Sequence, residues 1–172
     1  MTDRKLFGTN TLIKYFVERL TKVNTLDGGW STEYVDNETG RHWLKYVVDE
    51  RGFCENMMVI SPKPTTDELI DIAFTSPNPD EVSAAATRLN LEEQVDKKEF
   101  RQILIDKLNH LDILQLDKAE KERIKTIIQA SQLTDRVNKR DIMGKHFSEI
   151  QKDAAFFNST ADKAQEILNN LF

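Results

Sequence analysis

The side chains that most often perform chemistry are sparse in this sequence and lie far apart. The histidines have no second ligand three or four positions away, and they are His42, His110 and His146. A zinc site built from neighbouring ligands is therefore not expected. The single cysteine, Cys54, has no histidine beside it, and an isolated thiol is more typical of a packed side chain than of a nucleophile.

One pair of carboxylates has the spacing of metal ligands on a helix. Glu68 and Asp71 are three positions apart, and side chains so spaced lie on one helix face. Helical di-metal sites also need Glu-x-x-His pairs, which do not accompany these residues, and Glu68 is better explained as a capping partner of Thr65. We therefore predict no catalytic residue, no metal, no cofactor and a non-enzymatic protein.

Aromatic side chains are the best candidates for a binding surface. The set that we single out is concentrated in one segment and consists of Trp30, Tyr34, Trp43 and Tyr46. Tryptophan and tyrosine dominate the energetic centres of protein interfaces, so we name these four as binding residues. The alternative is that they pack on the helical core, because a short two-stranded segment needs such packing for stability.

The net charge of -5 is unevenly distributed along the chain. Residues 65–96 carry eight acidic side chains and only Arg88 as a basic one. Such a stretch disfavours direct nucleic-acid binding and suits a basic protein partner. Several of these carboxylates fall in the first turns of predicted helices, where the helix dipole favours them. Asp71, Glu92 and Glu93 do not, so they are the acidic binding residues that we predict.

The periodicity of apolar residues predicts the elements that carry these side chains. Residues 9–23 fit an amphipathic helix, and residues 30–61 fit two or three short strands or an irregular aromatic-rich segment. Four capping-box signals follow, in which Thr65, Asn78, Asp96 and Asp117 each precede a glutamate by three positions. They predict helices over 66–75, 79–90, 97–112 and 118–132. A looser pattern predicts a helix over 134–157, a break over 158–160 and a terminal helix.

The segment over residues 69–89 resembles a HEAT-type repeat, which pairs two antiparallel helices around a turn rich in Pro, Asn and Asp. Its second helix carries Asp80, Val82, Ala84, Ala85 and Leu89. The resemblance implies a mostly α fold with a minor β part, built as an irregular stack of antiparallel helix pairs. The order of an aromatic segment, a Pro-x-Pro linker and an acidic hairpin also resembles small bacterial toxin-immunity proteins.

These features together predict a single domain over 1–172, with a helix and an aromatic segment over 1–64 and a helical stack over 65–172. The sequence shows no membrane-spanning run and no secretion signal, and one cysteine fits a reducing compartment. We therefore expect a cytoplasmic protein-binding module, of the immunity or antagonist type, that binds a basic partner without contacting nucleic acid or membrane.

Two alternatives stay open. One is a small-ligand sensor or an enzyme with its site near His42, Trp43 and Lys45. The other is a subunit of a homo-oligomer that associates through the helix from Ser159 to Phe172.

Overall fold

The computed structural model describes residues 4–49 and 51–171. The chain forms two compact units, unit 1 (Met1–Ala85) and unit 2 (Ala86–Phe172). The described residues form five strands and six α-helices and are 51% helical and 14% strand. The fold is therefore α+β, and the predicted mostly α class is wrong. None of these helices is long and apolar enough to cross a membrane.

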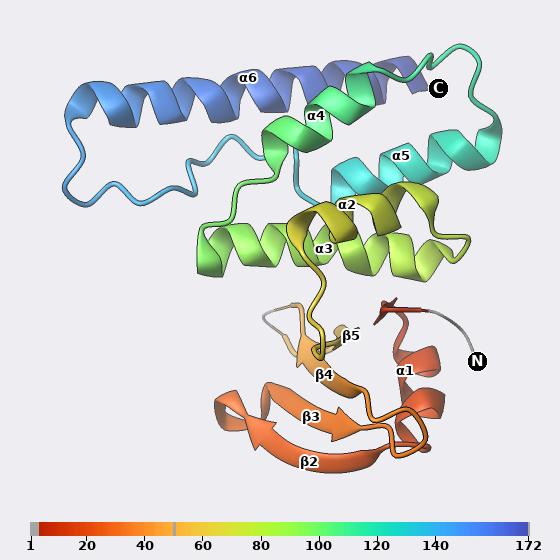
Figure 1. Ribbon diagram of the computed structural model, residues 1–172. Helices are drawn as coiled ribbons and strands as arrows, with labels where there is room; N and C mark the ends of the chain where they lie inside the picture. The colour runs from red at the N-terminus through yellow and green to blue at the C-terminus, as the bar shows by residue number, and fades with distance from the viewer. Residues whose placement is uncertain (1–3, 50, 172) are drawn as a thin grey trace. The chain divides into compact units, whose positions relative to one another are not determined.

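Unit 1 is built on an antiparallel sheet with the strand order β1-β5-β4-β3-β2 (Figure 1). The strands are β1 (Leu6–Phe7), β2 (Thr21–Leu26), β3 (Ser31–Val35), β4 (His42–Val47) and β5 (Glu55–Val59). The sequence predicted at most three strands, all after residue 30. The size of this sheet is what makes the class α+β.

Strand β2 replaces the end of the helix that was predicted over 9–23. Helix α1 (Asn10–Val17) is shorter than expected, and β2 follows it at the edge of the sheet. Every residue of β2 is exposed, so the strand lacks the apolar alternation by which strands are recognised. Its β-branched residues at alternate positions, Thr21, Val23 and Thr25, favour the extended conformation that it adopts.

One face of the sheet packs against helix α1. The buried side chains of this core are Phe7, Ile13, Tyr34, Trp43, Met57 and Val59, with Phe16, Val17 and Leu20 packed against them. Tyr34 and Trp43 are paired across β3 and β4, so their side chains leave the same face of the sheet. This core fixes the position of α1 over β4.

Strand β1 lies at the opposite edge, and carboxylates of helix α3 (Pro79–Asp96) cover that edge. The backbone N–H groups of Lys5 and Leu6 donate to Glu81 Oε1 at 2.8 and 3.1 Å. The N–H of Gly8 donates to Asp80 Oδ2 at 3.3 Å. These bonds occupy donors that would otherwise leave the edge open to another strand.

Helix α2 (Thr66–Thr75) completes unit 1, and its start was predicted correctly. The Thr65 side chain accepts from the Glu68 N–H at 3.2 Å, and Glu68 Oε2 accepts from the Thr65 N–H at 2.9 Å. This reciprocal pair is the predicted capping box.

Unit 2 contains the end of α3 and the helices α4 (Arg101–Asn109), α5 (Lys118–Ala130) and α6 (Phe147–Leu171). Both α4 and α5 pack against α6 (Figure 1). The capping box at Asp117 is confirmed. The one expected at Asp96 is not formed, because α3 continues through Asp96 and α4 begins only at Arg101.

The predicted helix over 134–157 is wrong in its first half. Residues 131–146 connect α5 to α6 without an α-helix. Ion pairs with α6 hold this loop, because Arg140 Nη1 and Lys145 Nζ donate to Asp153 at 2.6 and 2.7 Å. The break predicted over 158–160 lies inside α6, where Asn158 Nδ2 donates to the Ala154 carbonyl at 3.0 Å.

Candidate functional site

Two of the three predicted acidic contacts are buried in ion pairs. Glu92 is 2% exposed and accepts from Arg88 Nε at 2.9 Å and from Lys98 Nζ at 2.8 Å. Glu93 is 5% exposed and accepts from Arg101 Nε at 2.8 Å. Their carboxylates hold unit 2 together and do not face a partner, so the prediction of an acidic contact surface is corrected at both positions.

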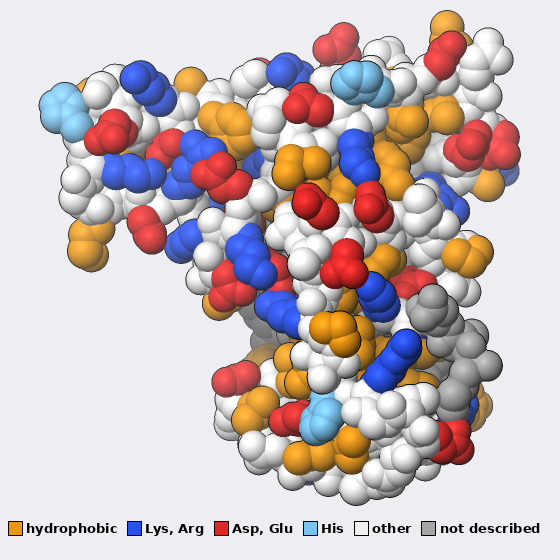
Figure 2. Space-filling model, in the orientation of Figure 1, with side chains coloured by type: hydrophobic (Ala, Val, Ile, Leu, Met, Phe, Trp, Pro, Cys, Tyr) orange, Lys and Arg blue, Asp and Glu red, His pale blue; other side chains and the backbone are white. Residues whose placement is uncertain are grey.

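Other carboxylates of the stretch 65–96 are also paired within the chain. Lys5 pairs with Glu68, and Arg4 pairs with Asp80 and Glu81. At least five of the eight carboxylates therefore have cationic partners among the described residues. Asp71 is the exposed member of the predicted acidic set. On the face drawn in Figure 2, acidic and basic side chains are interspersed and are not separated by sign. Cations of the same chain therefore neutralise much of the negative charge that the sequence shows for this stretch.

The four predicted aromatic binding residues are divided between core and surface. Tyr34, Trp43 and Tyr46 are buried, as the alternative of core packing expected. Trp30 is 51% exposed and follows the 3-10 turn Asp27–Gly29. Of the four, only Trp30 is therefore presented directly to a partner. Trp43 is buried and forms part of the lining of a groove that is described below.

The alternative site near His42, Trp43 and Lys45 is not assembled as one centre. Successive strand residues point to opposite faces of a sheet, so His42 leaves the face opposite to Trp43. His42 Nδ1 lies 2.8 Å from Glu33 Oε1, and Lys45 Nζ donates to Glu55 Oε1 at 2.7 Å. Of the three, Trp43 alone lines the groove described next.

An open groove of about 1090 Å³ lies in unit 1 between α1 and the turn that joins β3 to β4. Its lining residues are Arg4, Phe7, Leu12, Tyr15, Phe16, Arg19, Asp36, Thr39, Arg41 and Trp43. Leu12, Tyr15 and Phe16 have the spacing i, i+3, i+4 that places side chains on one face of α1, and Arg19 lies in the turn that follows this helix. Tyr15 and Arg19 were not among the predicted binding residues, although their spacing in the sequence could have indicated them.

The floor of the groove is aromatic. The Phe16 ring lies edge-on to Trp43 with their centroids 4.8 Å apart, and the Phe7 ring lies 5.7 Å from Trp43. The Arg4 guanidinium sits 4.3 Å above the Phe7 ring. The buried Nε1–H of Trp43 has no hydrogen-bond acceptor among the described residues. The groove thus offers an apolar, largely aromatic surface.

The charge of the groove is positive. Three arginines line it, of which Arg4 pairs with Asp80 and Glu81 outside the lining. The one carboxylate in the described lining, Asp36, is buried in a turn. Asp36 accepts from the Thr39 hydroxyl at 2.7 Å and from the Glu38 N–H at 3.0 Å. The hydrogen bond from Thr39 is the main cause of the lowered pKa of Asp36, and the charge of Arg19 lowers that pKa further. Asp36 is therefore ionised, but its oxygens accept hydrogen bonds within the turn. The arginines then determine which ligands the groove attracts.

The predicted oligomer contact is used inside unit 2. The apolar residues of the helix from Ser159 onward, Ala161, Ala164, Ile167 and Leu171, are buried, while Phe172 lies outside the described residues. This stripe is therefore not presented to a second copy.

No protein-family model matches the chain, and no curated protein and no solved structure is significantly similar to it. The HEAT-type resemblance of residues 69–89 therefore stays a prediction. The described residues contain no group of three or more side chains that could hold a metal ion.

Proposed function

We propose that this chain is a non-enzymatic protein-binding module, whose groove in unit 1 binds an acidic segment of a partner protein. The observation that carries the proposal is the joint lining of the groove by exposed aromatic residues and arginines. Tyr15 is 63% exposed on the wall, and Arg19 is exposed in the turn that follows α1. Tyrosine, tryptophan and arginine are the residue types that contribute most to interface energy.

The chemistry of the groove favours an acidic occupant. Arg19 follows α1, and Arg41 lies between β3 and β4. Asp36, the one carboxylate in the described lining, is hydrogen-bonded within its own turn. The basic partner that the acidic stretch suggested is therefore replaced by an acidic one. An aromatic or branched apolar side chain in the same segment would cover the floor formed by Phe7, Phe16 and Trp43.

The size of the groove favours a segment of polypeptide over a small molecule. Small-molecule sites usually enclose about 300 to 1,000 Å³ and bury most of the ligand, whereas this groove is larger and open. The described lining includes no histidine or cysteine, the side chains that most often act as a base or a nucleophile. A binding role therefore fits the lining better than catalysis does. A cytoplasmic location is part of the proposal and is consistent with the single, exposed Cys54.

The proposal is tested by selecting binders from a random peptide library displayed on phage. The enriched peptides are expected to combine Asp or Glu with an aromatic or branched apolar residue. Tyr15→Ala should weaken the selected peptides about 30-fold, the effect of an interface residue worth about 2 kcal/mol. Arg19→Glu should weaken them about tenfold and reduce the dependence of affinity on salt.

Matched controls come from the same unit. Lys14→Glu makes the same charge change on α1 at an exposed residue outside the groove lining, and Trp30→Ala removes an exposed aromatic outside it. Both controls should bind the selected peptides as the unaltered protein does. Enrichment of neutral or basic peptides, or an equal loss in the controls, would contradict the proposal.

A further inference from the structure

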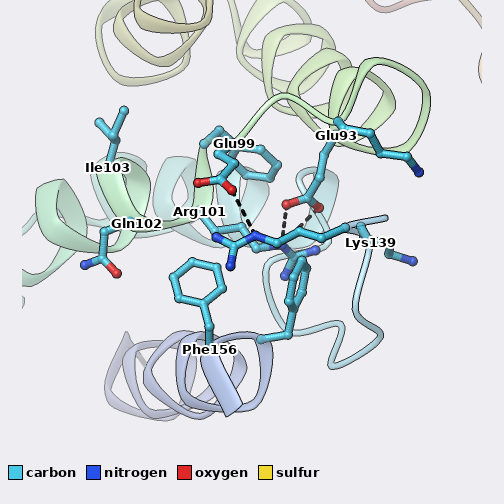
Figure 3. Close-up of a pocket in the computed structure, with 11 residues that line it drawn as sticks. Glu93, Glu99, Arg101, Gln102, Ile103, Lys139 and Phe156 are labelled. Carbon is cyan, nitrogen blue, oxygen red and sulfur yellow. Dashed lines mark hydrogen bonds and ion pairs between the residues drawn. The ribbon is translucent and has the colours of Figure 1, made fainter. Parts of the chain in front are cut away.

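Unit 2 contains a second cavity, separate from the groove of unit 1. It has a volume of about 300 Å³ and is lined by residues from the end of α3, from α4, from the loop before α6 and from α6 itself (Figure 3). The lining residues are Glu93, Lys97, Glu99, Phe100, Arg101, Gln102, Ile103, Lys139, Arg140, Phe156 and Phe157. The volume is at the small end of the range of ligand sites.

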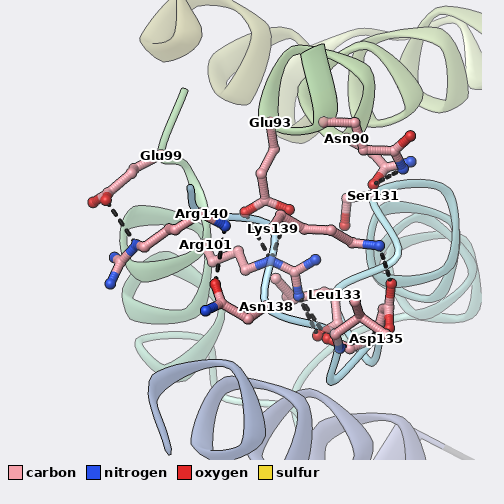
Figure 4. A network of polar contacts seen from close by, with 12 residues as sticks. Asn90, Glu93, Glu99, Arg101, Ser131, Leu133, Asp135, Asn138, Lys139 and Arg140 are labelled. Carbon is pink, nitrogen blue, oxygen red and sulfur yellow. Dashed lines mark hydrogen bonds and ion pairs between the residues drawn. The ribbon is translucent and has the colours of Figure 1, made fainter. Parts of the chain in front are cut away.

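The polar centre of this cavity is Arg101, which is 1% exposed. Its Nε donates to both carboxylate oxygens of Glu93, and its Nη1 donates to the carbonyls of Leu133 and Asp135 at 3.2 and 3.0 Å (Figure 4). Its Nη2 has no acceptor among the described residues. A buried donor without an acceptor is unfavourable, so this arrangement favours a bound acceptor.

A second donor of the same network is also unsatisfied. Asn138 uses its Oδ1 to accept from the Arg140 N–H at 2.9 Å, and its buried Nδ2 has no acceptor in the described chain. Figure 4 shows Asn138 and Arg101 in one cluster of polar contacts. The cluster therefore has more donors than acceptors. Of the two unsatisfied residues, Arg101 lines the cavity and can be reached by an anionic ligand there.

The charge balance around the cavity leaves one cation uncompensated. Arg101 pairs with Glu93, and Lys139 pairs with Asp135. Two further cations are balanced by two carboxylates. Arg140 binds Glu99 and Asp153, and Lys145 also binds Asp153. Lys97 Nζ donates to the Gln94 carbonyl at 3.0 Å and has no ion-pair partner among the described residues. Counted over these residues, the cations around the cavity exceed the carboxylates by one.

The walls of the cavity are apolar and flat. The Arg101 guanidinium lies 4.7 Å from the Phe157 ring centroid, and the Arg140 guanidinium lies 4.6 Å from that of Phe156. Phe100 and Ile103 complete the apolar lining. We propose that this cavity binds a small monocarboxylate that carries an aromatic or branched apolar body. The single uncompensated charge suits a carboxylate better than a doubly charged phosphate.

The test uses benzoate as the probe, benzamide as its neutral isostere and phenyl phosphate as the dianion. Each is titrated into the full, isotopically labelled chain, and binding is followed by amide chemical shifts. Benzoate should shift the amides of residues that line the cavity and bind at least about tenfold more tightly than either comparison compound. Lys97→Gln should weaken benzoate without changing benzamide, whereas Lys118→Gln, an exposed lysine on α5, should change neither.

A cavity-filling variant separates binding in the cavity from binding elsewhere. Ile103→Trp fills the rim, and Leu114→Trp adds the same side chain at an exposed position outside the lining. Benzoate binding should fall at least about tenfold in the first variant and stay unchanged in the second. The proposal is overturned if benzoate produces no shift at about 10 mM, if benzamide or phenyl phosphate binds as well as benzoate, or if Ile103→Trp has no effect.

Discussion

Replacement of the buried Arg101 by methionine tests the organisation of unit 2. Methionine keeps an unbranched apolar stem, is shorter than arginine, and removes the charge and the donors. Glu93 then stays 5% exposed without its cation, and the carbonyls of Leu133 and Asp135 lose their shared donor. Removing one partner of a buried ion pair costs about 3 to 5 kcal/mol. Each carbonyl that loses its donor costs about 1 kcal/mol more, so the loss for Arg101→Met is about 5 kcal/mol when the lower value for the ion pair is taken.

The double variant Glu93→Gln/Arg101→Met tests whether the buried, unpaired carboxylate causes the loss of stability. Neutral glutamine no longer leaves a buried charge, so the double variant should be more stable than Arg101→Met alone by about 2 kcal/mol or more. Urea unfolding followed by far-ultraviolet circular dichroism measures both, since the signal is dominated by helix. With an m-value of about 2 kcal/mol/M, the single variant should shift the midpoint by about 2.5 M urea.

Both tryptophans lie in unit 1, so fluorescence reports on that unit separately from the helical signal. Domains usually have a free energy of unfolding of about 5 to 15 kcal/mol. A loss of about 5 kcal/mol can therefore leave Arg101→Met unfolded without urea, and that result would agree with the expected loss. The double variant remains measurable in that case. A single variant within about 0.5 kcal/mol of the unaltered protein, or a double variant less stable than the single one, would refute the reasoning.

Three further changes have defined consequences in thermal or urea unfolding. Gly8→Ala places a Cβ 2.5 Å from the Asp80 carbonyl oxygen, so unit 1 should lose about 1 to 3 kcal/mol; an unchanged midpoint would contradict this contact. Thr65→Ala removes a capping box and should cost about 1 kcal/mol, whereas Thr65→Ser should cost little. Hydrogen bonds from Lys145 and Arg140 lower the pKa of Asp153. The stability lost in Asp153→Asn should therefore be constant above about pH 5 and shrink as acid protonates the carboxylate; a difference that grows in acid would oppose it.

The elements that were predicted correctly are those whose signals are local in sequence. The capping boxes at Thr65 and Asp117 involve residues three positions apart, and both form as expected. Strand β2 could not be recognised in the same way, because pairing with β3 stabilises it and its own side chains are all exposed. The loop over 131–146 likewise depends on ion pairs of Arg140 and Lys145 with a residue of α6.

The candidate site was less predictable than the helices, for the same physical reason. The charge count over 65–96 suggested an acidic surface, but the cations that neutralise Glu68 and Glu81 lie more than sixty residues earlier in the chain. The groove joins residues from α1 to residues of the β3–β4 turn, and only the sheet brings these together. Its helical wall, in contrast, is visible in the sequence as the spacing of Leu12, Tyr15 and Phe16.

The most direct measurement of the proposed binding function uses the two indole N–H signals of the labelled protein. Trp43 lies in the floor of the groove, and Trp30 lies outside its lining. A selected acidic peptide should shift the Trp43 signal and leave the Trp30 signal in place, and the same peptide with Asn and Gln in place of its acids should bind at least about tenfold more weakly. An unmoved Trp43 signal at saturation, or equal binding of the neutral peptide, would contradict the account.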